Sequence, residues 1–233
     1  MLTLDVPVRT VRSREVKVGL GGGGVFKPDW RMVAGMVKCP GWASAFLQNT
    51  LPRFANIQPY AGPNAGLNDT IRFARTEMGG AFSWDEVKRY RDRWKRPMIV
   101  KGLLHPEDAE IAVKIGIDGI LVSNHGGRQI EALPPPIDCV PAITKAVGSR
   151  ATVLFDSGVR SGTDVARALA LGANAALAGK AFLWGLGALG SEGPGHVIDL
   201  MIDELQSALG QIGAMSPAEA RNVKVRHPGA LQF

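Results

Sequence analysis

The sequence predicts an α/β fold, a partial (β/α)8 barrel, because short apolar runs alternate with segments of helical period. Four such runs, at residues 97–100, 119–122, 152–155 and 175–178, each lead into residues that can do chemistry. Strands that alternate with helices form parallel sheets with right-handed crossovers. A barrel carries its active site at the C-terminal ends of its strands, whereas a Rossmann-type sheet concentrates its signals at one glycine-rich turn. Four successive strand ends of this kind therefore favour the barrel.

The segments around these runs start and end as regular elements do. Residues 105–108 (His-Pro-Glu-Asp) place a proline and acidic side chains in a first turn, where both favour a helix. A second helix is expected over residues 161–171, with polar capping candidates before it and Gly172 at its end. One further strand is expected over residues 1–5, where the apolar run ends in an aspartate.

Residues 6–96 form a long irregular excursion between that first strand and the repeated units. Excursions of this length within a barrel are lids, inserted elements or disordered loops. The apolar stretch 30–51 reads as an amphipathic helix that carries Arg31 and Lys38. Packing onto the barrel is one explanation for it, and contact with a membrane surface is the other. We therefore expect a single domain over 1–233 with a loop and helix insert at 6–96.

Composition narrows the function classes. The formal net charge is +6, with 45% hydrophobic and 21% charged residues, which is typical of a globular domain. We find no nucleic-acid motif and no dense basic run, so we interpret the charge as attraction for an anionic substrate and cofactor, without a nucleic-acid partner. Cys39 and Cys139 lack metal-ligand spacing, which predicts no metal site. With only two cysteines a disulfide framework is not expected, and this favours a reducing, cytoplasmic location. Residues 1–14 do not resemble a signal peptide. The apolar stretch 171–190 is interrupted by Lys180 and five glycines, which argues against a membrane span there.

The motif at residues 123–129 (Ser-Asn-His-Gly-Gly-Arg-Gln) carries the sharpest chemical signal. His125 follows a strand and can take up a proton. The two glycines let the backbone turn tightly against a flat cofactor, and Arg128 offers a planar fork to a carboxylate. The alternative is a core histidine with satisfied hydrogen bonds, followed by a glycine turn.

Two later turns predict a phosphate site. Residues 156–163 (Asp-Ser-Gly-Val-Arg-Ser-Gly-Thr) follow one strand, and Gly179 and Lys180 follow the next. Barrels often hold phosphate in the loops after their last two strands and at a helix N-terminus. Gly158 and Gly179 allow a close backbone approach, while Arg160 and Lys180 supply positive charge. The alternative is a pair of ordinary βα turns with exposed basic side chains.

Two more strand ends carry charged side chains. Lys101 follows the run 97–100 and is placed to face the pocket, although a surface lysine is the default for any single lysine. Asp5 ends the first strand. Near His125 its carboxylate would orient and stabilise a protonated imidazole, whereas an aspartate in this position is by itself more often a turn residue.

Together these residues resemble those of the FMN-dependent 2-hydroxy-acid dehydrogenase family, which includes glycolate oxidase, lactate oxidase, L-lactate dehydrogenase and mandelate dehydrogenase. The matching stretches are 2–5, 100–102, 122–129, 156–164 and 179–185. The match that runs through these stretches covers nearly the whole chain outside the insert. The Ser-Asn-His-Gly-Gly-Arg-Gln motif is highly specific, whereas the Gly-Val-Arg-x-Gly-Thr-Asp stretch also occurs in other FMN barrels.

The resemblance implies catalytic roles residue by residue. His125 would take a proton as the substrate α-carbon is oxidised and electrons pass to the flavin. Asp5 would pair with His125, and Lys101 would favour the reduced, anionic flavin. Arg128 would bind the substrate carboxylate, helped by Arg14, because Glu15 follows that residue as in the family's Arg-Glu pair. This sequence has two more residues before that pair than the family pattern, so Arg12 is the alternative to Arg14 as the second arginine that binds the carboxylate.

The resemblance also implies FMN as the cofactor. The residues expected to contact FMN are Thr3, Lys101, Ser123, Asp156, Ser157, Gly158, Val159, Arg160, Gly179 and Lys180. The implied reaction converts a small L-2-hydroxy acid to the 2-oxo acid, with oxygen, a quinone or a cytochrome as electron acceptor. Family members are often homo-oligomers. Cysteine usage and the stretch 30–51, by contrast, predict a cytoplasmic location, either free or peripheral at the inner face of the membrane.

This sequence departs from the family pattern in three places. Lys180 replaces a usual arginine, which keeps the charge but loses the bidentate fork. Glu131 replaces a common aspartate. The family has roughly a hundred more residues before the strand that opens this chain, by the arithmetic of βα units. We therefore expect strands 4 to 8 of the family barrel, N-terminally truncated, with open sheet edges that need a partner.

Three hypotheses about function follow. The first is a flavoenzyme that oxidises a 2-hydroxy acid. The second is another FMN barrel, such as an isomerase, which would share the phosphate turns but would not need His125 and Arg128 at one strand end. The third is a non-catalytic truncated remnant or an interaction subunit, which absence of flavin from the purified protein would favour.

Overall fold

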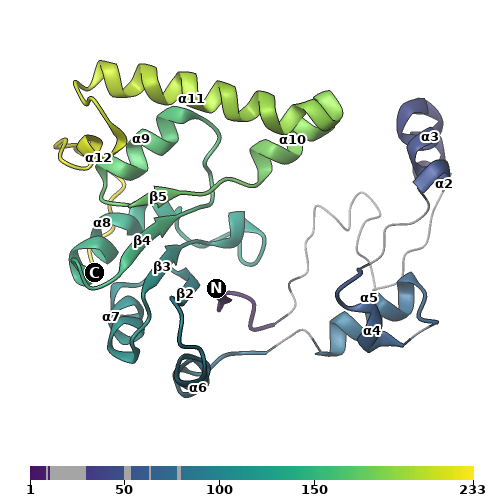
Figure 1. Ribbon diagram of the computed structural model, residues 1–233, viewed down its shortest axis with the longest axis horizontal. Coiled ribbons are helices and arrows are strands. Elements are labelled where there is room, and N and C mark those ends of the chain that lie inside the picture. Colours follow the sequence, from purple (N-terminus) through teal and green to yellow (C-terminus); the bar gives the residue numbers. More distant parts are fainter. Residues whose placement is uncertain (9, 11–29, 50–53, 63, 78–79) are drawn as a thin grey trace. The chain divides into compact units, whose positions relative to one another are not determined.

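The computed structural model describes residues 1–8, 10, 30–49, 54–62, 64–77 and 80–233 (Figure 1). Contacts between residues divide the chain into two units. The first joins Met1–Pro7 to Ala81–Phe233, and the second is Val8–Gly80. The division of the chain into one domain with an insert at 6–96 stays a prediction.

The first unit is built on a parallel sheet. Within the described residues the sheet has five strands, each paired with the next along the chain in the order β1-β2-β3-β4-β5. The strands are β1 (Leu2–Thr3), β2 (Ile99–Leu103), β3 (Gly119–Val122), β4 (Thr152–Phe155) and β5 (Ala175–Ala176). Because all five run the same way, their C-terminal ends share one edge of the sheet. The predicted α/β class and partial barrel are confirmed.

Helices lie between successive strands, as right-handed crossovers require, and further helices follow β5. They are α6 (Trp84–Arg93), α7 (Pro106–Ile115), α8 (Pro136–Val147), α9 (Gly162–Ala170), α10 (Lys180–Leu189), α11 (Gly193–Gln211) and α12 (Pro217–Ala220), with two 3-10 turns, η1 (His125–Gly127) and η2 (Gly190–Glu192). Figure 1 shows α10 and α11 side by side, with α9 between α11 and the sheet.

The predicted boundaries hold where the pattern was strongest. β3 and β4 coincide with the runs 119–122 and 152–155, and the helix expected over 161–171 is α9. The Ser161 hydroxyl caps α9 by accepting a hydrogen bond from the Asp164 amide at 3.1 Å. β5 is shorter than expected, with two residues in place of the run 175–178.

β2 extends two residues beyond the expected end at Lys101. The register shifts between Lys101 and Leu103, because Gly102 takes a left-handed φ of +100°. A glycine with positive φ commonly marks such a bulge.

The core lies between the sheet and the helices on its outer side. Ile120, Val122 and Val153 from the strands pack with Val140 and Ile143 of α8, all of them buried. β3 is buried along its whole length, which explains why it reads as a continuous apolar run.

Cys139 also lies in this core. Burial raises the pKa of its thiol to about 11, so the group stays protonated and packs as an apolar side chain. Both cysteines are free thiols, with Cys39 exposed.

The second unit contains α2 (Trp30–Lys38), α3 (Pro40–Asn49), α4 (Gln58–Ala61) and α5 (Leu67–Glu77). The expectation of one amphipathic helix over 30–51 is wrong, because two helices replace it with a break at Cys39. Pro40 explains the break, since a proline disfavours the helical conformation of the preceding residue and is itself well suited to a first helical turn. In the described part of the chain, no helix combines the length and apolarity needed to cross a membrane.

Candidate active site

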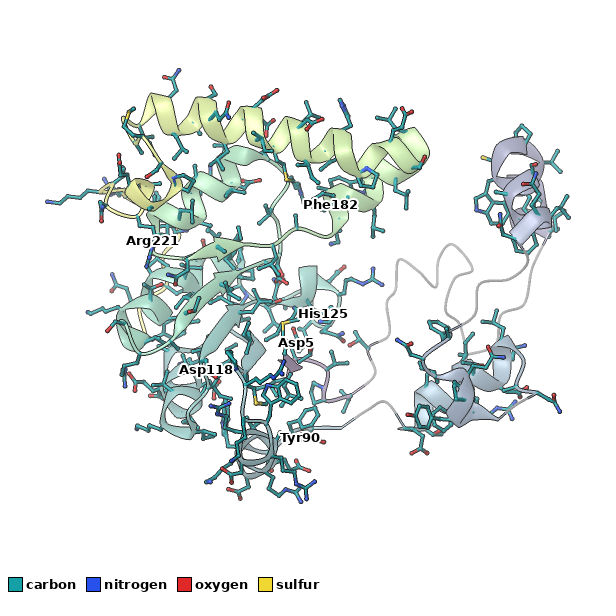
Figure 2. The ribbon with its side chains drawn as sticks, viewed as in Figure 1. Asp5, Tyr90, Asp118, His125, Phe182 and Arg221 are labelled. Carbon is teal, nitrogen blue, oxygen red and sulfur yellow. The ribbon has the colours of Figure 1, made fainter. Side chains whose placement is uncertain are left out.

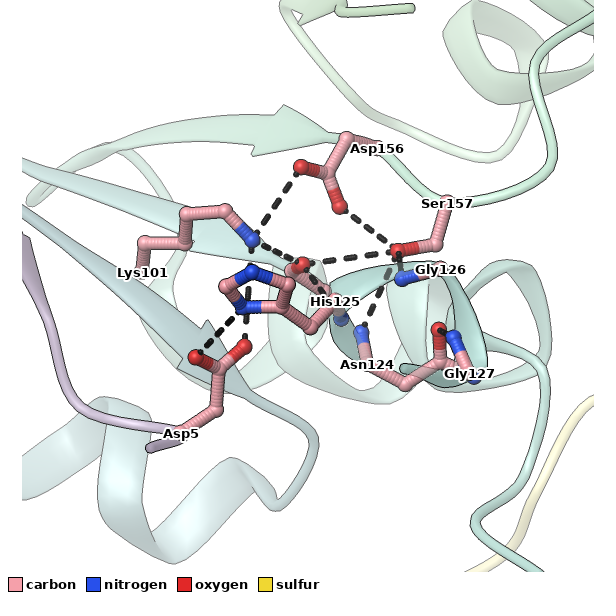
Figure 3. Close-up of polar contacts among 9 residues, drawn as sticks. Asp5, Lys101, Asn124, His125, Gly126, Gly127, Asp156 and Ser157 are labelled. Atoms are coloured by element: carbon pink, nitrogen blue, oxygen red, sulfur yellow. Dashed lines mark hydrogen bonds and ion pairs between the residues drawn. The ribbon is translucent and has the colours of Figure 1, made fainter. Parts of the chain in front are cut away.

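Parallel strand ends bring four predicted site residues together. Asp5 follows β1, Lys101 lies in β2, His125 follows β3 and Asp156 follows β4. Figure 2 shows the side chains of Asp5 and His125 next to each other, although 120 positions separate them in the sequence. The polar contacts among these residues form one connected network (Figure 3).

His125 and Asp5 form the pair that the resemblance implied. The His125 Nδ1 atom lies 3.0 Å from Oδ1 of Asp5. The Asp5 side chain is 8% exposed and that of His125 is 31% exposed, so the carboxylate is shielded while the ring remains accessible. When the Asp5 carboxylate accepts a hydrogen bond from Nδ1–H, the second ring nitrogen, Nε2, is left free to accept a proton.

Lys101 lies between two carboxylates. Its Nζ atom is 3.2 Å from Oδ2 of Asp156 and 3.8 Å from Oδ2 of Asp5, and it donates a hydrogen bond to the Ser123 hydroxyl. The longer distance is too great for a hydrogen bond, so Oδ2 of Asp5 is buried without a donor among the described residues. The ammonium still compensates part of its charge. The Lys101 side chain is only 13% exposed, so it is not a surface lysine, and its role in the site stays a prediction.

The loop after β3 has an unusual backbone. His125, Gly126 and Gly127 have φ angles of 59°, 68° and 71°, three consecutive residues in the left-handed region. Only glycine adopts this region freely, so His125 is in a disfavoured conformation that its surroundings must maintain. Such conformations concentrate at active sites.

Side chains hold this loop through its amides. The Ser123 hydroxyl, which is fully buried, accepts a hydrogen bond from the His125 amide at 3.0 Å. The Ser157 hydroxyl accepts from the amides of Asn124 and Gly126, and Oδ1 of Asn124 accepts from Gly127. The motif at residues 123–129 includes Asn124, but sequence reasoning gave this residue no role and did not foresee these contacts of Ser157.

Gly102 allows Asp5 to reach its place. A Cβ atom built on Gly102 would lie 2.5 Å from Cβ of Asp5 and 2.6 Å from its Cγ, so any side chain there would displace the carboxylate. The matching stretch 100–102 includes Gly102, but sequence reasoning gave this residue no role. A glycine within a strand often marks a bulge or a close backbone approach.

The remaining predicted residues are placed as follows. Thr3 is in β1, opposite Lys101 in the sheet register. Val159 is buried in the core. Arg128 directly follows η1 and is exposed. Arg14 and its alternative Arg12 lie outside the described residues.

Metal-ligating side chains do not gather in the described part of the chain, where no group of three or more His, Cys, Asp or Glu residues could hold an ion.

Comparison with known families decides the assignment. The family of FMN-dependent dehydrogenases matches residues 1–227 of the chain. The chain belongs to this family. The recognition of an FMN-dependent 2-hydroxy-acid dehydrogenase from its strand-end motifs is thereby confirmed.

Curated relatives of the chain support the same family assignment. An L-lactate dehydrogenase of Caulobacter sp. (strain K31) is 40% identical over 222 residues, covering 91% of this chain and 56% of the relative. An L-lactate dehydrogenase of Acinetobacter baylyi is 36% identical over 228 residues, covering 94% of this chain and 56% of the relative. The chain therefore spans little more than half the length of these curated relatives.

Solved structures of the family share the fold. An (S)-mandelate dehydrogenase, described as a monotopic membrane protein, has a TM-score of 0.87 at 32% identity, covering 94% of this chain and 57% of that protein. A mandelate oxidase in complex with 3,3-difluoro-2-hydroxy-3-phenylpropionic acid has a TM-score of 0.69 at 30% identity, covering 95% of this chain and 53% of that protein.

FMN is the cofactor of this family, and the ends of β4 and β5 fit its phosphate. Gly158 has a φ of +107°, and a Cβ atom on Gly158 or Gly179 would meet no heavy atom within 4 Å, so the backbone there is open to a ligand. Helix α10 begins at Lys180, with no acidic residue in its first turn and no side-chain cap. Uncapped amides at a helix N-terminus favour an anion.

The two basic side chains predicted for the phosphate have protein partners in this structure. The Arg160 guanidinium lies 5.7 Å from the centre of the Trp184 ring, within the range of a cation–π contact. The Lys180 ammonium donates to the Gly126 carbonyl at 2.7 Å and so connects the end of β5 to the histidine loop. Binding of phosphate by Arg160 and Lys180 stays a prediction.

The close contact between Gly102 and Asp5 predicts a large effect of one methyl group. We expect Gly102→Ala to lower the free energy of unfolding by about 3 kcal/mol, because it combines a left-handed φ with a clash against Asp5. Gly116→Ala is the matched control, since Gly116 also has a positive φ, +93°, but meets only the end of the Arg91 side chain at 3.7 Å. It should lose about 1–2 kcal/mol. If urea denaturation showed the same loss of unfolding free energy in both variants, this account of Gly102 would be contradicted.

Proposed function

We propose that this chain carries the site of an FMN-dependent enzyme that oxidises a small L-2-hydroxy acid to the corresponding 2-oxo acid. The observation that carries the proposal is the His125–Asp5 pair at the C-terminal edge of the sheet, within contact of Lys101. Another kind of FMN barrel would share the phosphate turns but would not need this pair beside Arg128.

The charges of the network support His125 as the base. Asp5 and Asp156 each contribute −1 and Lys101 contributes +1, so the group carries −1 while the imidazole is neutral and 0 once it is protonated. Uptake of a proton at Nε2 of His125 therefore balances the charge of a partly buried group. FMN, when bound, accepts the two electrons that the substrate α-carbon loses.

In this proposal, arginine side chains bind the substrate carboxylate. Arg128 lies three residues after His125, and its guanidinium can form two parallel hydrogen bonds with a carboxylate. Arg14 is the second arginine of this proposal, with Arg12 as its alternative. The names of the relatives, which include L-lactate and mandelate enzymes, support a 2-hydroxy monocarboxylate as the substrate class.

The proposed cofactor contacts follow the strand ends. Lys101 supplies positive charge to the flavin, which favours its reduced form. Thr3 lies on β1 and Ser123 directly follows β3, the two strands that neighbour β2. Asp156 would bind the ribityl chain. The phosphate would lie against the open backbone at Gly158 and Gly179.

We also propose that residues 30–51 contact a membrane surface from the cytoplasmic side. Val33, Val37 and Leu47 on α2 and α3 are 52%, 77% and 81% exposed, which is unusual for side chains of this type. The monotopic (S)-mandelate dehydrogenase supports this interpretation. A membrane quinone would then be a suitable electron acceptor, although oxygen and a cytochrome remain alternatives. Self-association, which the family resemblance implies, stays a prediction.

The proposal predicts that His125→Gln abolishes turnover without loss of FMN. The glutamine keeps a polar side chain but cannot act as a base, so kcat should fall by a factor of about 100 to 10,000. His196→Gln, on α11, is the matched control and should leave kcat unchanged. Turnover with L-lactate and L-mandelate, together with FMN per chain, measures both effects. Retained turnover in His125→Gln would remove this residue from the role of base.

The membrane proposal predicts cosedimentation with vesicles of phosphatidylcholine and phosphatidylglycerol. Val37→Asp should weaken it severalfold, because it places a charge on the apolar face of α2. Met215→Asp is the control, since Met215 is 89% exposed and lies near the C-terminus, outside α2 and α3. If the wild-type protein, Val37→Asp and Met215→Asp bound the vesicles equally, α2 would be ruled out as the membrane contact.

A further inference from the structure

We infer that Ser157 is a positioning residue for the base, acting through its hydroxyl on the backbone on both sides of His125. This inference rests on the proposed function of His125. The family resemblance placed Ser157 among the FMN contacts, whereas its contacts in the structure connect it to the loop after β3.

The hydrogen bonds of the Ser157 hydroxyl are complete within the protein. Its oxygen accepts from the Gly126 amide at 2.9 Å and from the Asn124 amide at 3.3 Å, and its proton is donated to Oδ1 of Asp156 at 2.8 Å. A hydroxyl has one proton and two lone pairs. These three bonds use all of them, and the remaining contact, with Ser123 Oγ, is longer at 3.4 Å. The side chain therefore has no strong hydrogen bond left for a flavin.

The two amides that Ser157 holds flank the base. Between them, the His125 amide binds the Ser123 hydroxyl, so three successive amides are held by two serine side chains (Figure 3). His125 has a left-handed φ that a non-glycine residue does not adopt without support. The Ser157 hydroxyl supplies part of that support from the neighbouring strand end.

Ser157 also connects the loop to the charged part of the site. The carboxylate that accepts its proton, Asp156, is bound through its other oxygen to Lys101. The hydroxyl therefore couples the backbone around His125 to the ion pair beside the ring. A shift of the base by even 1 Å relative to its substrate lowers the rate strongly, so loss of this hydroxyl should lower kcat more than it changes KM.

A purely structural role makes a different prediction. Ser157 itself has a φ of 74°, in the region that favours glycine. If the residue served only to make the turn, Ser157→Gly would be neutral or stabilising. If the hydroxyl positions the base, Ser157→Gly and Ser157→Ala should be impaired alike, although only the alanine variant retains the backbone strain.

The experiment compares Ser157→Ala, Ser157→Gly and a control, Ser216→Ala, in the full chain. The Ser216 hydroxyl accepts a hydrogen bond from the Glu219 amide at the start of α12, so its loss is the same chemical change far from the base in sequence. Hydrogen exchange of the individual amides is measured first, since it needs no turnover. FMN per chain, kcat and KM follow.

We expect the Asn124 and Gly126 amides to exchange about tenfold faster or more in both Ser157 variants, because each loses one acceptor. In the control they should not change. With FMN content unchanged, kcat should fall about tenfold and KM should change less than about twofold.

Unchanged exchange at these amides, or wild-type kcat in Ser157→Gly, would overturn the inference. Absence of turnover in the wild-type protein would instead contradict the proposed function, and the exchange data would still decide whether Ser157 holds the loop.

Discussion

The ammonium of Lys101 lies between the carboxylates of Asp5 and Asp156, and the rest of the site is arranged around it. Strands β1, β2 and β4 of one parallel sheet carry these groups, so the geometry depends on the strand register and on the bulge at Gly102. One ammonium does not balance two carboxylates, and the excess negative charge lies beside the ring of His125. The sheet topology therefore determines which charges lie around the imidazole.

Backbone strain is concentrated at the same place. Among the described residues, the non-glycine residues with positive φ are His125 and Ser157, and the Ser157 hydroxyl bonds to the amides on either side of His125. Neither residue adopts this conformation without support, so each strand-end loop helps to maintain the other. The open backbone at Gly158 begins directly after Ser157, which places the base and the predicted phosphate site on connected loops.

The sequence predicted the parallel sheet well, because buried parallel strands read as continuous apolar runs such as 119–122 and 152–155. It did not predict the extension of β2, which depends on the φ angle of Gly102, or the break at Cys39, where the apolar pattern continues across Pro40. The pairing of Asp5 with His125 came from family resemblance, since no local pattern relates residues so far apart. The contacts of Ser157 and Lys180 could not be read from the sequence, because they depend on a left-handed serine and on how two loops approach each other.

The most direct test of the account is the amount of FMN bound by the purified chain. The protein would be titrated with FMN, and bound flavin would be measured by absorbance and by quenching of flavin fluorescence. The account predicts saturation at about one FMN per chain, because the open backbone after β4 and β5 and the charge of Lys101 lie within the described residues. A folded chain that binds no flavin at saturating FMN would contradict the claim that this segment holds the family's cofactor site.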